Sequence, residues 1–335
     1  MTDAQQNTPS LTEKTTQVNA DAPIFGVHFL GDTAAFVLGE EKLFLVGPGG
    51  EERRIDIHGG AVLASACDGK RVVTGGDDGK IIAVAADGTV ETLGEDGKRR
   101  WIDRVATGPD SAVAWSAGRD VTVRTAKGEL RTTEAPTSPG GLAFAPKGFR
   151  LAIAHYNGVT LWFPNAAAKP ETLEWKGSHL DVTFSPDGRF LITSMQEPML
   201  HGWRLTDGKD MRMAGYAGRV RSLSWSAEGK WLATSGATQL VIWPFQGKDG
   251  PMGKQPRLAA PGESRVEQVA YHPSREVVAA GFSDGLVLLI RTEDSAEILV
   301  RRPDGAPVTA LAWNTSGALL AWGTETGEAG LLDLS

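Results

Sequence analysis

The stretch Val182–Leu205, VTFSPDGRFLITSMQEPMLHGWRL, decides the fold that this sequence predicts. It contains three short apolar runs, which are separated by Ser185–Gly188 (SPDG) and Gln196–Pro198 (QEP). Proline presets φ, aspartate caps its own backbone and glycine accepts positive φ, so SPDG is a turn. Three strands of about five residues joined by tight turns form an antiparallel meander, which cannot bury both of its faces alone. The meander therefore needs copies of itself.

The chain supplies these copies. An aromatic residue followed by a turn recurs at steps of 40, 41, 46 and 42 residues, at Phe144, Phe184, Trp225, Tyr271 and Trp313. Three weaker copies precede them, near Ile24 with Phe29, around Asp68-Gly69 and from Trp101 onward. The sequence therefore consists of eight repeated units.

A repeat of about 40 residues with about four short strands is typical of a β-propeller blade. We expect an all-β chain that forms a single propeller of four-stranded antiparallel blades, with eight blades, or seven as the alternative. The apolar residues run in period two or in short solid runs, which favours strands over amphipathic helices. The expected units are about 23–58, 59–99, 100–137, 138–177, 178–217, 218–263, 264–304 and 305–335.

The two ends of the chain complete this pattern. The last unit, VTALAWNTSGALLAWGTETGEAGLLDLS at 308–335, supplies three strands but no fourth. A propeller left open there would expose a sheet edge. We expect a strand from residues 11–21 (LTEKTTQVNAD) to close it, within a propeller domain that spans 11–335. Residues 1–10 are polar without a strand pattern, which predicts a disordered tail.

The repeats resemble the WD40-repeat family over residues 24 to 335. FSPDGRFLIT from Phe184 and WSAEGKWLATSG from Trp225 are similar to its first two strands and the turn between them. Its late-strand tryptophan and its Asp-Gly turn have counterparts at Trp162, Trp203 and Trp243, and at Asp78-Gly79, Asn157-Gly158 and Asp284-Gly285. No Trp-Asp or Gly-His dipeptide occurs, which departs from the family pattern. The resemblance implies a non-catalytic scaffold for protein–protein interaction.

The composition narrows the classes of function. A net charge of −7 disfavours a general nucleic-acid binder, which normally has a basic surplus. One cysteine, Cys67, cannot form an intrachain disulfide. No apolar run approaches the roughly 20 residues that span a bilayer, and the N-terminus has no export signal pattern. We therefore expect a cytoplasmic protein without membrane contact; the oligomeric state is left open.

The starts of several units carry charge and aromatic bulk, which the family resemblance places on one face. Trp, Tyr and Arg are the residue types that dominate interface energetics. The candidate partner-binding residues are Trp101, Asp103, Arg104, Tyr216, Arg219, Arg221, Arg265 and Glu267. Four arginines against few carboxylates predict a partner with a locally acidic surface.

Two alternatives use titratable side chains. Counting back five residues from the first-strand aromatic gives an apolar residue in four units but His179 in the fifth, which we expect on the side of the central tunnel. His155, His179 and Glu197 are then neighbours that could ligate a divalent metal or a small ligand, although no local motif joins them. The less favoured alternative is a propeller enzyme with His179, Asp181 and Glu267 at the tunnel. Known nucleophile, phosphate-loop and zinc motifs are absent from the sequence, so we expect no enzymatic activity and no obligatory cofactor.

Overall fold

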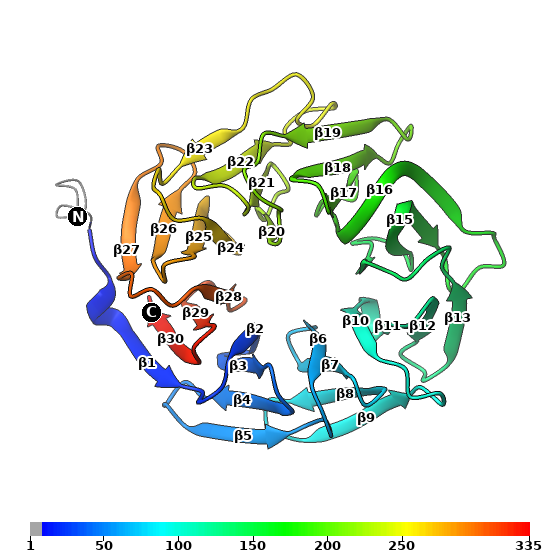
Figure 1. The fold of residues 1–335 in the computed structure, drawn as a ribbon, viewed down its shortest axis with the longest axis horizontal. Coiled ribbons are helices and arrows are strands. Elements are labelled where there is room, and N and C mark those ends of the chain that lie inside the picture. The colour runs from blue at the N-terminus through cyan, green and yellow to red at the C-terminus, as the bar shows by residue number, and fades with distance from the viewer. Residues whose placement is uncertain (1–8) are drawn as a thin grey trace. The chain divides into compact units, whose positions relative to one another are not determined.

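The computed structural model describes residues 9–335. It consists of two compact units, Met1–Leu38 with Tyr216–Ser335 and Gly39–Gly215, which are described separately. Figure 1 labels their strands. The first unit contains η2 Thr12–Lys14, β1 Thr15–Asn19, β2 Ile24–Leu30, β3 Thr33–Leu38, β20 Leu223–Trp225, β21 Trp231–Thr234, β22 Leu240–Pro244, β23 Arg257–Ala259, β24 Val266–Tyr271, β25 Val277–Phe282, β26 Val287–Arg291, β27 Glu297–Arg301, β28 Val308–Trp313, β29 Leu319–Thr324 and β30 Glu328–Asp333.

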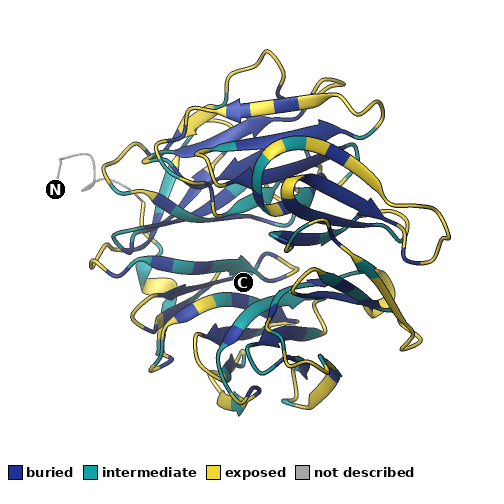
Figure 2. Ribbon diagram, turned by 45° about the vertical axis from the view of Figure 1, so that its right-hand side comes forward, coloured by how far each residue is buried: buried dark blue, intermediate teal, exposed yellow. Residues whose placement is uncertain are grey.

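The second unit is likewise built from antiparallel strands. It contains β4 Lys42–Val46, β5 Glu52–Asp56, β6 Val62–Cys67, β7 Arg71–Gly76, β8 Lys80–Ala85, β9 Val90–Glu95, β10 Ile102–Thr107, η3 Pro109–Ser111, β11 Val113–Ala117, β12 Asp120–Arg124, β13 Leu130–Glu134, β14 Gly141–Phe144, β15 Leu151–Trp162, β16 Glu171–Phe184, β17 Phe190–Met195, β18 Met199–Arg204 and β19 Asp210–Ala214. In both units the exposed residues collect in the loops and outer strands, and the buried residues lie in the strands between them (Figure 2). Among residues 9–335 no helix has the length and apolar character of a membrane-spanning segment.

The strands of the described residues form seven sheets, so the expected eight separate blades are not observed. Six sheets have four strands, as predicted, and the seventh contains six, in the order β14-β15-β16-β17-β18-β19. The physical reason is that two long strands join neighbouring groups of strands: β15 has 12 residues and β16 has 14, and β16 pairs with β15 through Glu171–Ser178 and with β17 through His179–Phe184. The prediction of an all-β chain of four-stranded antiparallel sheets is otherwise confirmed.

An N-terminal strand completes the last sheet of the first unit. β1 pairs antiparallel with β30, Thr15 opposite Leu332 and Asn19 opposite Glu328, as predicted for residues 11–21. Figure 1 shows β1 in blue alongside β30 in red. Pro9 and Leu11 also exchange backbone hydrogen bonds of 2.7 Å with Leu299 of β27. The predicted tail over 1–10 is therefore wrong for Pro9 and Ser10, while residues 1–8 lie outside the described part of the chain.

The first strands share a construction that fixes the repeat register. In six of them a buried residue is followed by a one-residue register shift, a bulge that re-aims the next side chain. The residues before the shifts are Ile24, Val62, Ile102, His179, Val266 and Val308. His179 thus occupies the position that apolar residues fill elsewhere, as the sequence count predicted. Its ring is 1% exposed, so the expectation that it faces a tunnel is wrong.

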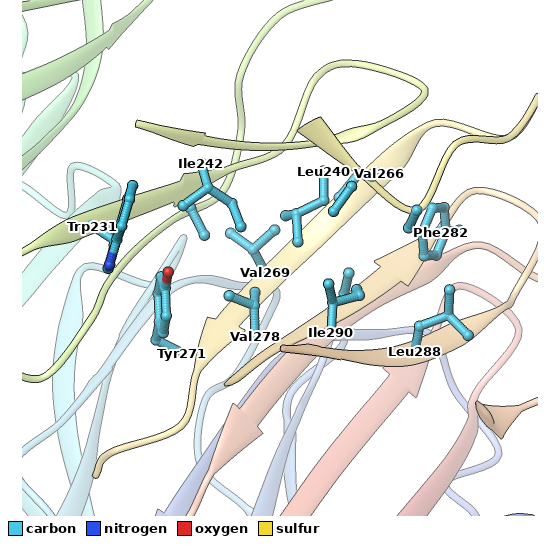
Figure 3. Packing of buried hydrophobic residues seen from close by; sticks show 14 of the residues in the cluster. Trp231, Leu240, Ile242, Val266, Val269, Tyr271, Val278, Phe282, Leu288 and Ile290 are labelled. Atoms are coloured by element: carbon cyan, nitrogen blue, oxygen red, sulfur yellow. The ribbon is translucent and has the colours of Figure 1, made fainter. Parts of the chain in front are cut away.

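The core lies between the faces of successive sheets. In the first unit, Trp231, Leu240 and Ile242 from β21 and β22 pack against side chains of β24, β25 and β26 (Figure 3). In the second unit, Trp203 packs with Leu173 and Leu191 at the joint between the halves of the six-stranded sheet. Trp162, Trp203 and Trp243 are 7%, 2% and 7% exposed, which confirms the predicted burial of the repeat tryptophans.

Candidate functional site

In the second unit, three of the candidate partner-binding residues lie at the start of β10. Trp101 is 66% exposed. Asp103 occupies the bulge and accepts a 3.2 Å hydrogen bond from Ser116 Oγ. Arg104 Nε donates a 2.5 Å hydrogen bond to the Gly140 carbonyl, so this guanidinium ties β10 to the start of β14. Trp101 is therefore available to a partner, whereas Arg104 is partly committed to the fold.

In the first unit, the loops that precede β20 and β24 carry three arginines and are joined by backbone hydrogen bonds. Gly218 N donates to Gly236 O at 2.8 Å, and Gly236 N donates to Val266 O at 3.1 Å. A Cβ added to Gly218 would lie 3.6 Å from Arg265 Cδ, so Arg265 lies directly over the loop that carries Arg219 and Arg221. We call Arg219, Arg221 and Arg265 the arginine surface; all three are exposed.

Glu267 is the carboxylate of this surface. It occupies the bulge of β24 and accepts a 2.7 Å hydrogen bond from Arg265 Nε. Its side chain is 13% exposed, against 50% for Arg265. The more buried Glu267 carboxylate therefore orients the Arg265 guanidinium. The exposed groups of the arginine surface carry positive charge.

Tyr216 was predicted at the partner surface, and this prediction is wrong. Its ring is 8% exposed, and its hydroxyl is hydrogen-bonded to Thr234 Oγ1 at 2.8 Å and to Trp243 Nε1 at 2.7 Å. Burial raises the pKa of the Tyr216 hydroxyl, partly offset by these two partners. Tyr216 is therefore a structural residue whose hydroxyl joins the loop before β20 to Thr234 of β21 and Trp243 of β22.

The histidines proposed as metal ligands are buried in the second unit and have protein partners. His155 contacts Tyr156 O and Thr160 Oγ1, both at 2.9 Å. His179 contacts Thr193 Oγ1 at 2.7 Å and Trp175 O at 3.0 Å. Burial lowers the pKa of both rings, and backbone carbonyls oppose the shift.

Glu197 lies close enough to His179 to act on its pKa, but its own side chain is exposed. Within residues 9–335 no group of three or more His, Cys, Asp and Glu side chains is arranged to hold a metal. A metal at His155 and His179 would have to displace the four hydrogen bonds that the rings already make.

The alternative of a propeller enzyme requires Asp181 and His179 to face the same site, and in the second unit they do not. Asp181 follows the bulge after His179, and its side chain is exposed while the histidine ring is buried. Desolvation by the surrounding protein raises the pKa of the Asp181 carboxyl, against the effects of the Val182 N–H and the Arg104 guanidinium. Glu267 lies in the other unit.

Two histidines have environments that the sequence did not indicate. His58 Nδ1 lies 3.0 Å from Asp78 Oδ1, and its Nε2 lies 2.9 Å from Thr74 Oγ1. The Asp78-Gly79 turn was the available signal for this network. His201 is fully buried, and neither of its ring nitrogens has a hydrogen-bond partner among the described residues. Burial lowers the pKa of His201 to about 3, with contributions from His179 and Arg212.

Comparison with known proteins agrees with these repeats. Two family models match parts of the chain: "WD domain, G-beta repeat" over residues 211–243 and "Anaphase-promoting complex subunit 4 WD40 domain" over residues 269–335. A computationally designed protein, Ika8, has a similar fold with a TM-score of 0.78 at 16% identity, covering 94% of this chain and 97% of its own. That identity shows the fold alone.

Curated relatives match at low identity. WD repeat-containing protein 55 of Rattus norvegicus is 25% identical over 202 residues, which is 58% of this chain and 51% of the relative. The WD repeat and HMG-box DNA-binding protein 1 of Xenopus laevis is 26% identical over 145 residues, 43% of this chain and 12% of the relative. The chain thus spans about half the length of the first and a small part of the second. Together with the repeats, these matches support a WD40-repeat β-propeller family for the chain.

Proposed function

We propose that the protein is a non-catalytic scaffold that binds an acidic protein surface through the arginine surface, Arg219, Arg221 and Arg265. The single observation that carries this proposal is their clustering on one backbone-bonded set of loops, where Gly218, Gly236 and Val266 are joined by hydrogen bonds of 2.8 and 3.1 Å. A rigid backbone lowers the ordering cost of binding. The family commonly binds other proteins, which supports the same class of function.

The charge balance supports an acidic partner. Glu267 neutralises part of Arg265 but is itself largely covered. Arg221 uses its backbone N–H to bond Ser235 Oγ at 3.1 Å, which fixes the loop independently of its side chain. The exposed guanidiniums therefore create a local positive field on a chain with a net charge of −7. Such a field accelerates the encounter with a negative surface more than it raises affinity.

The experiment is a quantitative affinity purification from an extract of the native cell with wild-type protein and the double variant Arg219→Glu/Arg221→Glu. The proposal expects the variant to lose one or more acidic proteins that the wild type retains. The matched control is Arg275→Glu/Arg302→Glu, which reverses two exposed arginines of the same unit outside the arginine surface. Equal recovery of every protein by wild type and double variant would contradict the proposal.

We also propose that the six-stranded sheet carries two repeats, which restores the count of eight units. In its support, β15 has a register shift between Tyr156 and Gly158, and β16 changes partner along its length: Glu171–Ser178 pair with β15 and His179–Phe184 pair with β17. A Cβ added to Gly140 would lie 2.0 Å from His179 O, so the chain entering β14 packs tightly against the second half of β16. We expect such a contact between the first strands of two neighbouring repeats, here β14 and the second part of β16. A crystal structure with seven separate blades would contradict the proposal.

A further inference from the structure

The turn between β9 and β10 in the second unit presents an exposed tryptophan beside two exposed cations. Lys98, Arg99 and Trp101 follow one another almost without interruption in the sequence DGKRRW. Trp101 is 66% exposed, the largest exposed fraction among the large hydrophobic residues of the described chain. Large exposed aromatic side chains flanked by polar residues mark interaction sites.

A carboxylate at the base of the turn holds its backbone. Asp96 Oδ2 accepts hydrogen bonds from Lys98 N at 3.1 Å and from Arg100 N at 2.9 Å. The Arg100 guanidinium binds Asp96 at 2.7 Å and Asp120 at 2.9 Å. The side-chain hydrogen bond from Arg100 lowers the pKa of Asp96 to about 2, so the carboxylate stays charged at neutral pH. We call residues 96–101 the Asp96 turn.

The Asp96 turn holds one residue in a conformation that is rare for its type. Arg99 has φ 53°, and a Cβ added to Gly79 would lie 3.0 Å from Arg99 Cα, so the turn packs tightly on the neighbouring backbone. Asp96 N donates to Gly79 O at 2.8 Å, and Arg99 N donates to Asp96 O at the same distance. Non-glycine residues in the left-handed region persist where surrounding bonds impose them, and they cluster at binding sites.

The charges of the turn are of two kinds. Arg100 is neutralised by Asp96 and Asp120 and serves the structure. Lys98 and Arg99 are exposed, and within residues 9–335 neither forms an ion pair. The turn therefore offers two available positive charges next to one apolar ring.

We propose that the Asp96 turn is a docking site for an acidic protein segment that carries an aromatic or aliphatic side chain among its carboxylates. The apolar side chain packs on the Trp101 indole, and the carboxylates pair with Lys98 and Arg99. A nucleic-acid strand fits less well, because it needs a continuous basic groove and the exposed Glu95 adjoins the turn. This site shares no residue with the arginine surface, so the two proposals are tested independently.

The test uses three defined probes in a fluorescence or calorimetric titration at low salt. They are a peptide of six glutamates around one phenylalanine, the same peptide with alanine for phenylalanine, and a ten-nucleotide polyuridine. The proposal expects the phenylalanine peptide to bind most tightly. Trp101→Ala should weaken that binding about tenfold, and Trp101→Phe should largely preserve it. Lys98→Glu/Arg99→Glu should also weaken it about tenfold, with the difference disappearing at high salt.

The controls separate this site from general charge and from the arginine surface. Lys127→Glu/Lys169→Glu and Tyr156→Ala alter exposed cations and an exposed aromatic ring of the same unit, and should bind the peptide as wild type does. Unchanged thermal unfolding of each variant shows that the fold is intact. Equal peptide binding by wild type and the Trp101 and Lys98/Arg99 variants would overturn the proposal, as would tighter binding of polyuridine than of the peptide. Loss of peptide binding only in Arg219→Glu/Arg221→Glu would overturn this site and leave the proposed function standing.

Discussion

The imidazole of His201 stacks on the indole of Trp175, with ring centroids 4.0 Å apart and an interplanar angle of 15°. Trp203 meets the same imidazole edge-on at 4.7 Å. The ring is enclosed by aromatic groups, and its two nitrogens have no hydrogen-bond partner among the described residues. The carboxylate oxygen Asp210 Oδ2 lies 3.9 Å from Nε2. Shape and stacking therefore stabilise this joint, while the unsatisfied polar atoms destabilise it.

We predict that His201→Phe raises the free energy of unfolding by about 1–3 kcal/mol at pH 8. The phenyl ring keeps the stack on Trp175 and removes the cost of burying unpaired nitrogens. His179→Phe is the matched comparison, because that ring makes hydrogen bonds of 2.7 and 3.0 Å. It should lower the free energy of unfolding by a similar amount. Urea unfolding measures both; destabilisation by His201→Phe comparable to that of His179→Phe would contradict the prediction.

We predict that the protein loses stability as pH falls below about 6.5, the ordinary histidine pKa. Burial lowers the pKa of His28 to about 4 and of His201 to about 3, so the unfolded chain binds protons before the folded one does. Stability is therefore full above pH 6.5 and declines toward the folded values. At pH 5, His201 alone accounts for about 2 kcal/mol.

Carboxyls act in the opposite direction in part of this range. Desolvation by the surrounding protein raises the pKa of Asp181, Glu276 and Glu297, so these carboxyls take up protons more readily in the folded state and add stability as pH falls. The contribution of His201 is isolated by comparing wild type with His201→Phe at pH 8 and pH 5. The variant's advantage should grow by about 2 kcal/mol at the lower pH. A constant advantage would show that His201 is protonated equally in both states.

Strand positions were predictable because they depend on local chemistry. The aromatic residue followed by a turn fixed the register around Phe184 and Trp225, and the count back to His179 found the position that precedes the bulge. The burial of Trp203 followed from its place in the repeat. The strand β1 was predictable because the last repeat lacked a fourth strand to pair with β30.

The remaining features depend on contacts that the sequence does not encode locally. Tyrosine is a residue type that is common at interfaces, but the Tyr216 hydroxyl completes a hydrogen-bond network with Thr234 and Trp243 of β21 and β22. Arg104 was predicted to bind a partner, and the sequence did not indicate that its Nε also donates to Gly140 O, 36 residues away. Gly177, at φ 115°, lies inside β16, and the sequence alone does not show that the strand continues through it. The Asp96 turn was missed because the role of Asp96 emerges only when its hydrogen bonds are known.

Trp203→Ala should destabilise the protein by roughly 3–5 kcal/mol, because it removes a large ring that is 2% exposed and leaves a cavity. Trp162→Ala should have a similar effect. Trp243→Ala additionally removes the 2.7 Å hydrogen bond to Tyr216, which leaves a buried hydroxyl with one partner fewer. Chemical unfolding measures all three. A loss below 1 kcal/mol for any of them would show that its indole is not packed as described.

Deleting residues 1–22 should lower the melting temperature by several degrees. The deletion removes β1, exposes the edge of β30 and leaves the backbone of Leu299 without its bonds to Pro9 and Leu11. The control deletion, residues 1–8, keeps all of these bonds and should have a smaller effect. Equal melting temperatures for the full chain and the 1–22 deletion would show that β1 adds nothing to the stability of the sheet.

The most direct test of the scaffold proposal is the association rate of the acidic protein recovered most abundantly with the wild type, measured at 50 and 500 mM salt. Arg219→Glu/Arg221→Glu should slow association at low salt, with a smaller effect on dissociation, and the difference should shrink at high salt because ions screen the field. Arg275→Glu/Arg302→Glu should associate as the wild type does. Identical association rates for the wild type and the Arg219/Arg221 variant at both salt concentrations would contradict a binding role for the arginine surface.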